Sequence, residues 1–221
     1  MSLTNIKIIP MRRALFFDLD GTLWDALIPL CESWNEAMEN NNLPYRFDLP
    51  IMLSYMGLTP LETVHLAFKD VDEETGLKYF DICFQHEIKY LSIHPGKLYP
   101  HEEEVIAKLS KLCDLYVVSN ADCGYIENYL NACGMAKYFK GHLCAGDTKL
   151  DKCDNIKLLK DKENIDEVIY IGDTNKDMIE TLKAGVPFIH ASYGFGKIDN
   201  PPYKITSLLE LEDIVRKIFK I

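Results

Sequence analysis

The chain has 221 residues, a length that suits one α/β domain of ordinary size with a small insertion. Its composition is 48% hydrophobic and 26% charged, as in globular proteins, and its apolar runs fall short of the ~20 residues that a membrane helix needs. The formal net charge of −10 argues against a nucleic-acid partner, because such binding depends on basic patches that meet phosphates.

The seven cysteines are scattered along the chain, and no two have Cys-x-x-Cys spacing. An odd number without that spacing argues against a disulfide framework or a zinc site, so we expect reduced thiols in a cytoplasmic protein. The apolar run at residues 14–17 is too short for a secretory signal, whose apolar part usually has about 7–15 residues. Residues 1–10 are an unusual lead into that run, and Met11 is a second candidate for the natural start.

The run Ala14–Phe17 predicts a buried strand, and two carboxylates follow it directly. Asp18 and Asp20 stand one residue apart, and Gly21 then turns the chain. In open α/β sheets the carboxyl ends of strands face the crevice where ligands bind. Asp18 is therefore a candidate nucleophile and Asp20 its acid/base partner, with a metal bridging to a phosphate. The alternative is an ordinary turn, in which Asp-Gly is common.

Residues 24–94 lack the alternation of strands and predict a helical insertion. A capping box with proline at the first helical position starts a helix at Thr59–Glu62, and Pro95-Gly96 ends the last one. Two further helices are predicted by apolar residues at helical spacing, which we expect to serve core packing: Leu27, Leu30, Trp34 and Met38, then Leu77, Phe80, Phe84, Ile88 and Leu91.

After Pro95 the pattern alternates between strands and helices, which predicts a parallel sheet with right-handed crossovers. The last helix is expected to open with a capping box at Ser207–Glu210. The fold class is thus α/β, with a core of residues 13–23 and 99–221 and an inserted helical cap at 24–94. The expected strands are 115–119, 142–144, 168–171 and 188–191, and the expected helices are 101–111, 124–132, 153–162 and 175–184.

Three further groups of polar residues follow predicted strands or open helices. Ser119 and Asn120 end the second strand, where a hydroxyl and a backbone N–H can bind phosphate oxygens. Lys152 opens a helix, with Lys149 as a nearby competitor, and Gly172-Asp173 follows the strand at 168–171 with Asp177 four residues later. Taken singly, these are a turn serine, a solvated lysine and acids favoured at a helix N-terminus.

Together the motifs DxDGT, SN, K and GDxxxD occur in a fixed order that resembles the haloacid dehalogenase (HAD) superfamily. The resemblance covers residues 13–219 and points to the phosphoglycolate-phosphatase-like branch, which carries an α-helical cap. It implies a Rossmann-like parallel sheet sandwiched by helices, with the cap inserted after the first strand.

The resemblance also implies chemical roles. Asp18 would attack phosphorus and form an aspartyl-phosphate, and Asp20 would protonate the leaving alkoxide and then take a proton from the hydrolytic water. Ser119, Asn120 and Lys152 would bind the phosphate, and Lys152 would also orient Asp18.

The implied cofactor is Mg²⁺, a cation that prefers oxygen ligands. Asp18, the backbone carbonyl of Asp20 and Asp173 would be its protein ligands. Asp177 would support Asp173 and Lys152 from behind. A bound divalent cation and one lysine would also let an acidic protein accept an anionic substrate.

Three other chemistries lack the residues that they need. The chain has no GxSxG elbow for a serine hydrolase. Cys144 has no arginine shortly after it to cradle a phosphate, as a cysteine phosphatase would require. Dehalogenase relatives lack a carboxylate at the position of Asp20, because their chemistry has no alkoxide to protonate. The presence of Asp20 therefore argues for phosphoryl transfer. The favoured function is therefore a Mg²⁺-dependent phosphatase of small phosphorylated metabolites. The alternatives are a phosphomutase of the β-phosphoglucomutase type and a binding module on an inactive scaffold.

Specificity is expected to come from the cap. Arg46 is the only arginine or lysine between Gly21 and Phe68, so it is the candidate to meet a carboxylate such as that of phosphoglycolate. The alternative is a solvated surface charge. Pro60 stands where mutase relatives carry a cap arginine for a second phosphate, which favours a monophosphate substrate.

Overall fold

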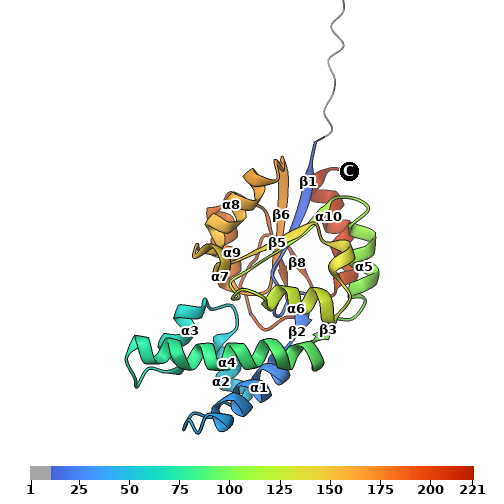
Figure 1. The fold of residues 1–221 in the computed structure, drawn as a ribbon. Coiled ribbons are helices and arrows are strands. Elements are labelled where there is room, and N and C mark those ends of the chain that lie inside the picture. Colours follow the sequence, from blue (N-terminus) through green and yellow to red (C-terminus); the bar gives the residue numbers. More distant parts are fainter. Residues whose placement is uncertain (1–10) are drawn as a thin grey trace, which may run out of the picture.

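The computed structural model of the protein describes residues 11–221, so the questions about residues 1–10 lie outside it. A helix-flanked sheet forms one part of the molecule and a group of helices forms the other (Figure 1). Within residues 11–221, no helix combines the length and apolar character needed to cross a membrane.

The sheet has six strands in the order β5-β4-β1-β6-β7-β8, and every neighbouring pair is parallel. This confirms the expected parallel sheet. β1 lies in the middle, and its last residue, Phe17, pairs with Val117 of β4 and Ile171 of β6. The segments that follow these strands therefore meet at one edge. The strands are β1 (Arg13–Phe17), β4 (Asp114–Ser119), β5 (Gly141–Cys144), β6 (Glu167–Gly172), β7 (Phe188–Ala191) and β8 (Lys204–Ile205).

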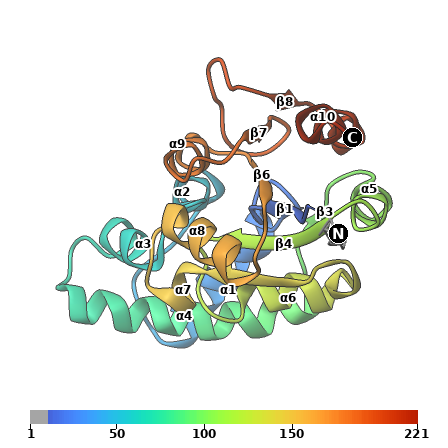
Figure 2. The same cartoon turned by 90° about the horizontal axis from the view of Figure 1, so that it is seen from above.

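Helices cover both faces of the sheet (Figures 1 and 2). Side chains alternate along β1, so Leu15 and Phe17 pack into one buried cluster while Ala14 and Phe16 pack into another. The first cluster is covered by α5 (Glu102–Leu109), α6 (Tyr125–Ala132) and α10 (Leu211–Phe219). The second cluster is covered by α8 (Lys152–Lys162) and α9 (Asn175–Lys183).

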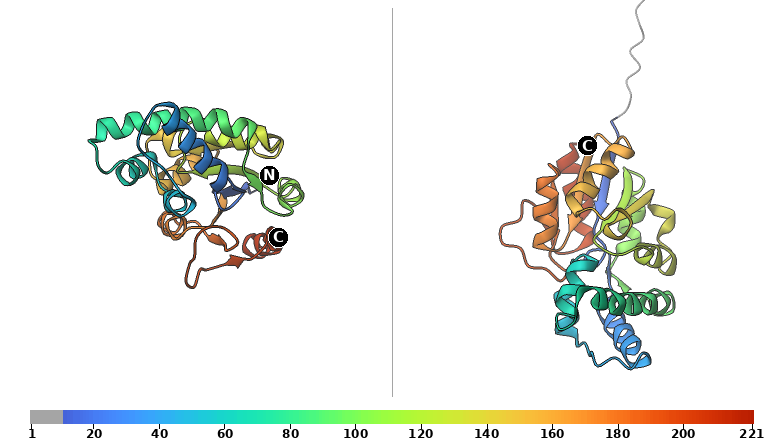
Figure 3. Two further views of the ribbon diagram at one scale, coloured as in Figure 1. Left: turned by 90° about the horizontal axis from the view of Figure 1, so that it is seen from below. Right: turned by 60° about the vertical axis from the view of Figure 1, so that its left-hand side comes forward.

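The cap lies beyond the carboxyl ends of the strands (Figures 1 and 3). A two-stranded antiparallel ribbon marks where the chain leaves for the cap and returns, with Trp24 opposite Leu98. In α1 the apolar stripe Leu30, Trp34 and Met38 is buried, as its spacing predicted. The elements are β2 (Trp24–Asp25), α1 (Leu27–Asn40), α2 (Leu49–Tyr55), α3 (Pro60–Ala67), α4 (Glu73–Ile93) and β3 (Lys97–Leu98).

The two predicted capping boxes have different outcomes. Thr59 forms its box with Glu62 and starts α3 as expected. The box at Ser207 is wrong: its hydroxyl accepts from the N–H of Leu209, while the Glu210 carboxylate accepts from Thr206. A 3-10 turn (Leu208–Glu210) results, and α10 begins after it. The other short elements are a 3-10 turn (Ala136–Tyr138) and α7 (Ala145–Thr148).

Candidate active site

A buried lysine and two carboxylates form the centre of the site at the edge of the sheet. Nζ of Lys152 lies 2.9 Å from Oδ1 of Asp18 and also contacts Oδ1 of Asp177. The Lys152 side chain is fully buried at the first position of α8. Lys149 is exposed and ends α7 with a φ of 59°, so the structure brings Lys152 rather than Lys149 to Asp18.

Burial and mutual attraction shift the pKa values of these groups in opposite directions. The pKa of Asp18 is raised from 3.8 to about 6, because burial and nearby Asp177 raise it by more than Lys152 lowers it. Burial alone would lower the pKa of Lys152, but the carboxylates of Asp177 and Asp18 outweigh it and raise that pKa well above its ordinary value. Lys152 therefore carries its charge at neutral pH, directly beside the predicted nucleophile.

Asp20 is held by two donors, one four residues further along the chain and one from α6. The Trp24 Nε1–H and the Tyr125 hydroxyl both donate to its Oδ1, at 3.0 and 2.8 Å. Burial raises the pKa of Asp20 to about 7; the Tyr125 hydrogen bond opposes this rise and Asp18 adds to it. A carboxyl group that titrates near neutral pH can both give and take a proton, as general acid–base catalysis requires.

Asp173 follows β6 and is fully buried. Its Oδ2 accepts hydrogen bonds from the backbone N–H groups of Phe195 and Gly196, at 2.7 and 3.1 Å. Gly21, with a φ of +76°, passes so close that a Cβ there would lie 2.3 Å from the same oxygen. Only glycine fits this position, both for its backbone conformation and for the close approach.

The acidic residues at this edge fit a hard divalent cation. Carboxylate oxygens of Asp18, Asp173 and Asp177 lie within 4.8 Å of one another, and Oδ1 of buried Asp173 has no hydrogen-bond partner among the described residues. Asp177 is already engaged, because its Oδ2 accepts from the N–H and hydroxyl of Thr174 while Oδ1 meets Lys152. Asp18 and Asp173 are thus the better placed ligands, and Asp177 positions Lys152.

Ser119 is the last residue of β4 and Asn120 follows it, and both are buried. The Ser119 hydroxyl accepts from the N–H of Ala121 at 3.3 Å. The Asn120 side-chain amide donates to the carbonyl of Gly57 at 2.9 Å, so it links the core to the cap. This contact with the cap was not foreseen for a predicted phosphate-binding residue.

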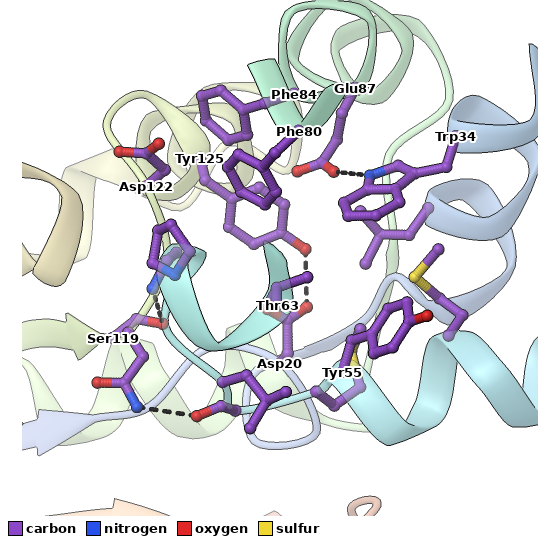
Figure 4. A pocket seen from close by; sticks show the side chains of 18 of the residues that line it. Asp20, Trp34, Tyr55, Thr63, Phe80, Phe84, Glu87, Ser119, Asp122 and Tyr125 are labelled. Carbon is purple, nitrogen blue, oxygen red and sulfur yellow. Dashed lines mark hydrogen bonds between the residues drawn. The ribbon is translucent and has the colours of Figure 1, made fainter. Parts of the chain in front are cut away.

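A pocket opens between the cap and the end of the sheet (Figure 4). It holds about 660 Å³ of space, counting the part open to solvent. Asp18, Asp20, Ser119 and Asn120 line its core side. The other lining residues include Trp34, Phe80, Phe84, Glu87, Asp122 and Tyr125.

The structure does not bring Arg46 to this pocket. Its side chain is exposed in the connection between α1 and α2. The guanidinium donates to the backbone carbonyls of Leu43 and Tyr45, at 3.2 and 2.7 Å, and Arg46 is not among the lining residues. Arg46 thus occupies the surface position that was its alternative.

Sequence reasoning missed several groups that shape the site. Backbone donors at Phe195 and Gly196 leave no side-chain signature, although the Gly-x-Gly spacing at 194–196 signals a close backbone approach. Glu87 had a clearer signal. It lies at helical spacing from Phe84 and Leu91, so an acid interrupts the apolar stripe of α4.

Comparison with known proteins agrees with this geometry. Residues 15–191 match the model of the haloacid dehalogenase-like hydrolases, and the chain belongs to this family of enzymes.

Individual relatives extend over almost the whole chain. A phosphoglycolate phosphatase of Vibrio vulnificus is 25% identical, over 92% of this chain and 96% of its own. Among solved structures, a predicted phosphatase from Clostridium acetobutylicum has a TM-score of 0.74 at 25% identity, covering 96% of this chain and 100% of its own. A haloacid dehalogenase-like hydrolase from Streptococcus pneumoniae has a TM-score of 0.79 at 22% identity, covering 92% and 98%.

Proposed function

We propose that the protein is a Mg²⁺-dependent phosphatase that hydrolyses small phosphomonoesters through an aspartyl-phosphate on Asp18. The observation that carries the proposal is the contact of Asp18 with buried Lys152, next to an Asp20 whose pKa is about 7. The phosphatases among its relatives support the same reaction class.

The residues divide the reaction between them. A carboxylate oxygen of Asp18 attacks phosphorus as the bond to the ester oxygen breaks, and Asp20 gives its proton to the leaving alkoxide. Asp20 is then deprotonated and accepts a proton from the water that attacks the aspartyl-phosphate, which releases inorganic phosphate and restores Asp18. Lys152 orients Asp18 and offsets part of the phosphate's negative charge.

Mg²⁺ would be held by Asp18, the backbone carbonyl of Asp20 and Asp173. When bound, it would supply positive charge that draws an anionic phosphate into this acidic pocket. The geometry of Asp173 supports this role: one oxygen is fixed by the loop at 195–196, and the other is left without a protein partner in the described chain.

The phosphomutase alternative requires a site for a second phosphate. None of the described residues that line the pocket is an arginine, lysine or histidine. A second phosphate would therefore be buried without a matching positive charge, which is costly. This observation favours hydrolysis of monophosphates.

The test is phosphate release from a panel of phosphomonoesters with Mg²⁺ and with excess EDTA. We expect Asp18→Asn to keep less than about one per cent of kcat, a barrier rise of roughly 3 kcal/mol or more, because the substitution removes the attacking charge. Asp173→Ala should abolish the dependence on Mg²⁺ together with most of the activity. The matched control is Asp199→Asn, which changes an exposed carboxylate and should leave kcat unaltered. Undiminished activity in EDTA, or in Asp18→Asn, would overturn the proposal.

A further inference from the structure

The cap side of the pocket combines aromatic side chains with one buried acid. Trp34 comes from α1, Phe80 and Phe84 come from α4, and Tyr125 faces them from the core (Figure 4). Glu87 projects from α4 into the same space and is only 5% exposed. A carboxyl group in such surroundings is costly unless it has a partner.

Within the described chain, the Glu87 carboxyl group receives only part of the hydrogen bonding that it can accept. Oε2 of Glu87 accepts from the Trp34 Nε1–H at 2.5 Å, and Oε1 has no hydrogen-bond partner in the described part of the chain. The charged groups that act on it are Asp20 and Asp122, which are both acidic. Among the described residues, the fold therefore places Glu87 beside aromatic side chains and supplies no cation to it.

The charged residues along the whole pocket indicate where a cation for Glu87 could come from. Its described lining contains four acids, Asp18, Asp20, Glu87 and Asp122, and no basic residue. Asp18 and Asp20 are assigned to the phosphate end. Glu87 and Asp122 remain beside the leaving group of the substrate, where a cationic group would stabilise their ionised form and an anionic group would not. Aromatic faces also attract cations, especially where water is excluded.

We propose that the leaving group carries a cationic nitrogen, which is seated among the aromatic side chains and meets Oε1 of Glu87. The substrate class is then a phosphomonoester of an amino alcohol. This inference rests on the proposed phosphatase activity and names its substrate class. It replaces the expectation that Arg46 binds a carboxylate, because the pocket turns an acid rather than a base toward the substrate.

The activity test uses substrates that differ in charge at one position. Phosphocholine and 3,3-dimethylbutyl phosphate have the same shape but differ in one positive charge, and O-phosphoethanolamine and phosphoglycolate carry opposite charges at similar positions. In the wild type we expect kcat/KM to favour each cationic member by about tenfold or more. Higher or equal values for phosphoglycolate or the neutral isostere would overturn the inference while leaving the phosphatase proposal intact.

Two variants test whether that preference depends on Glu87 and on the aromatic side chains around it. Glu87→Gln retains an oxygen that can accept from Trp34 and removes the charge, so the preference for the cation should fall by about tenfold. Phe80→Leu removes an aromatic face without altering the carboxyl and should lower the same ratio. The matched control is Glu74→Gln, an exposed position on the same helix, which should leave the ratio unchanged. A ratio that survives in both Glu87→Gln and Phe80→Leu would contradict the assignment.

A binding test separates this inference from the proposed activity. Free choline or ethanolamine, without phosphate, should raise the Tm of the wild type and of Glu74→Gln, and should have no effect on Glu87→Gln. If this shift is seen while no phosphomonoester is hydrolysed, the proposed function fails and the cation site at Glu87 stands. If hydrolysis is seen without any shift and without preference for cationic substrates, the cation site is refuted and the function stands.

Discussion

The two ends of the pocket treat buried charge in opposite ways. At the core end, Lys152 lies between Asp18 and Asp177, so the chain supplies both signs of charge. At the cap end, Glu87 receives one hydrogen bond from the neutral indole of Trp34, and its charged neighbours are acidic. The core end is therefore organised before substrate arrives, whereas the cap end leaves Glu87 without a cation until substrate arrives.

This difference corresponds to a difference in task. The phosphate is common to every substrate of a phosphatase, so charges fixed in the fold can serve every substrate. The leaving group is what distinguishes one substrate from another, and an unbalanced group rejects ligands that fail to satisfy it. The following changes test whether the two ends differ in this way.

The largest effect is expected for Asp20→Asn at the core end. An alkyl phosphate leaves as a basic alkoxide that needs a proton, so its turnover should fall by about 10²–10⁴-fold. p-Nitrophenolate is a much weaker base, so p-nitrophenyl phosphate should lose less. The measurement is kcat for both esters in wild type and variant. Equal losses on the two would refute the acid role in the first step, though not the later role as base.

A smaller but still large effect is expected for Lys152→Met. The substitution leaves two buried carboxylates, Asp18 and Asp177, without their cation, and breaking such a pair typically costs about 3–5 kcal/mol. Urea denaturation should show this loss in the free energy of unfolding, measured without Mg²⁺. Lys149→Met is the control, because it changes an exposed lysine and should cost less than about 0.5 kcal/mol. Equal losses in the two variants would mean that the core end is not held by its charges.

Sequence reasoning reached the core end because its signals are local. The apolar run at residues 14–17 predicts β1, and the acids that follow it must lie at the edge of the sheet. The strand at 168–171 places Asp173 at the same edge by the same argument. The sequence also predicted the parallel order of strands and helices, because periodicity distinguishes the two over segments of this length.

The remainder depends on contacts between distant segments. β8 has two residues, Lys204–Ile205, which is too short for any periodic pattern. The hydrogen bond from Tyr125 to Asp20 joins residues 105 positions apart, and no local sequence pattern predicts it. Arg46 failed for a related reason: its charge is visible in the sequence, but the direction of its side chain is set by the loop that carries it.

The last predicted effect concerns the pH dependence of stability, which changes by at most about 1.4 kcal/mol per pH unit, and it tests the cap end without substrate. Burial raises the pKa of Glu87 from its ordinary value of 4.5 to about 8; the Trp34 hydrogen bond opposes this rise, and Asp20 and Asp122 add to it. Between these values the folded state keeps a proton that the unfolded state has lost. Its contribution to the free energy of unfolding is therefore complete below about pH 4.5 and is lost as the pH rises toward 8.

Glu87→Gln cannot titrate, so it lacks this dependence. From pH 5 to 8 the wild type should lose stability relative to the variant, by up to about 1.4 kcal/mol per pH unit, and the difference should level off above pH 8. Chemical denaturation of both proteins across this range, without Mg²⁺, measures it, and the subtraction removes the groups they share. A difference that stays constant with pH would show that Glu87 is ionised and balanced in the folded protein. The two ends of the pocket would then be built alike, because each would balance its buried carboxylate without substrate.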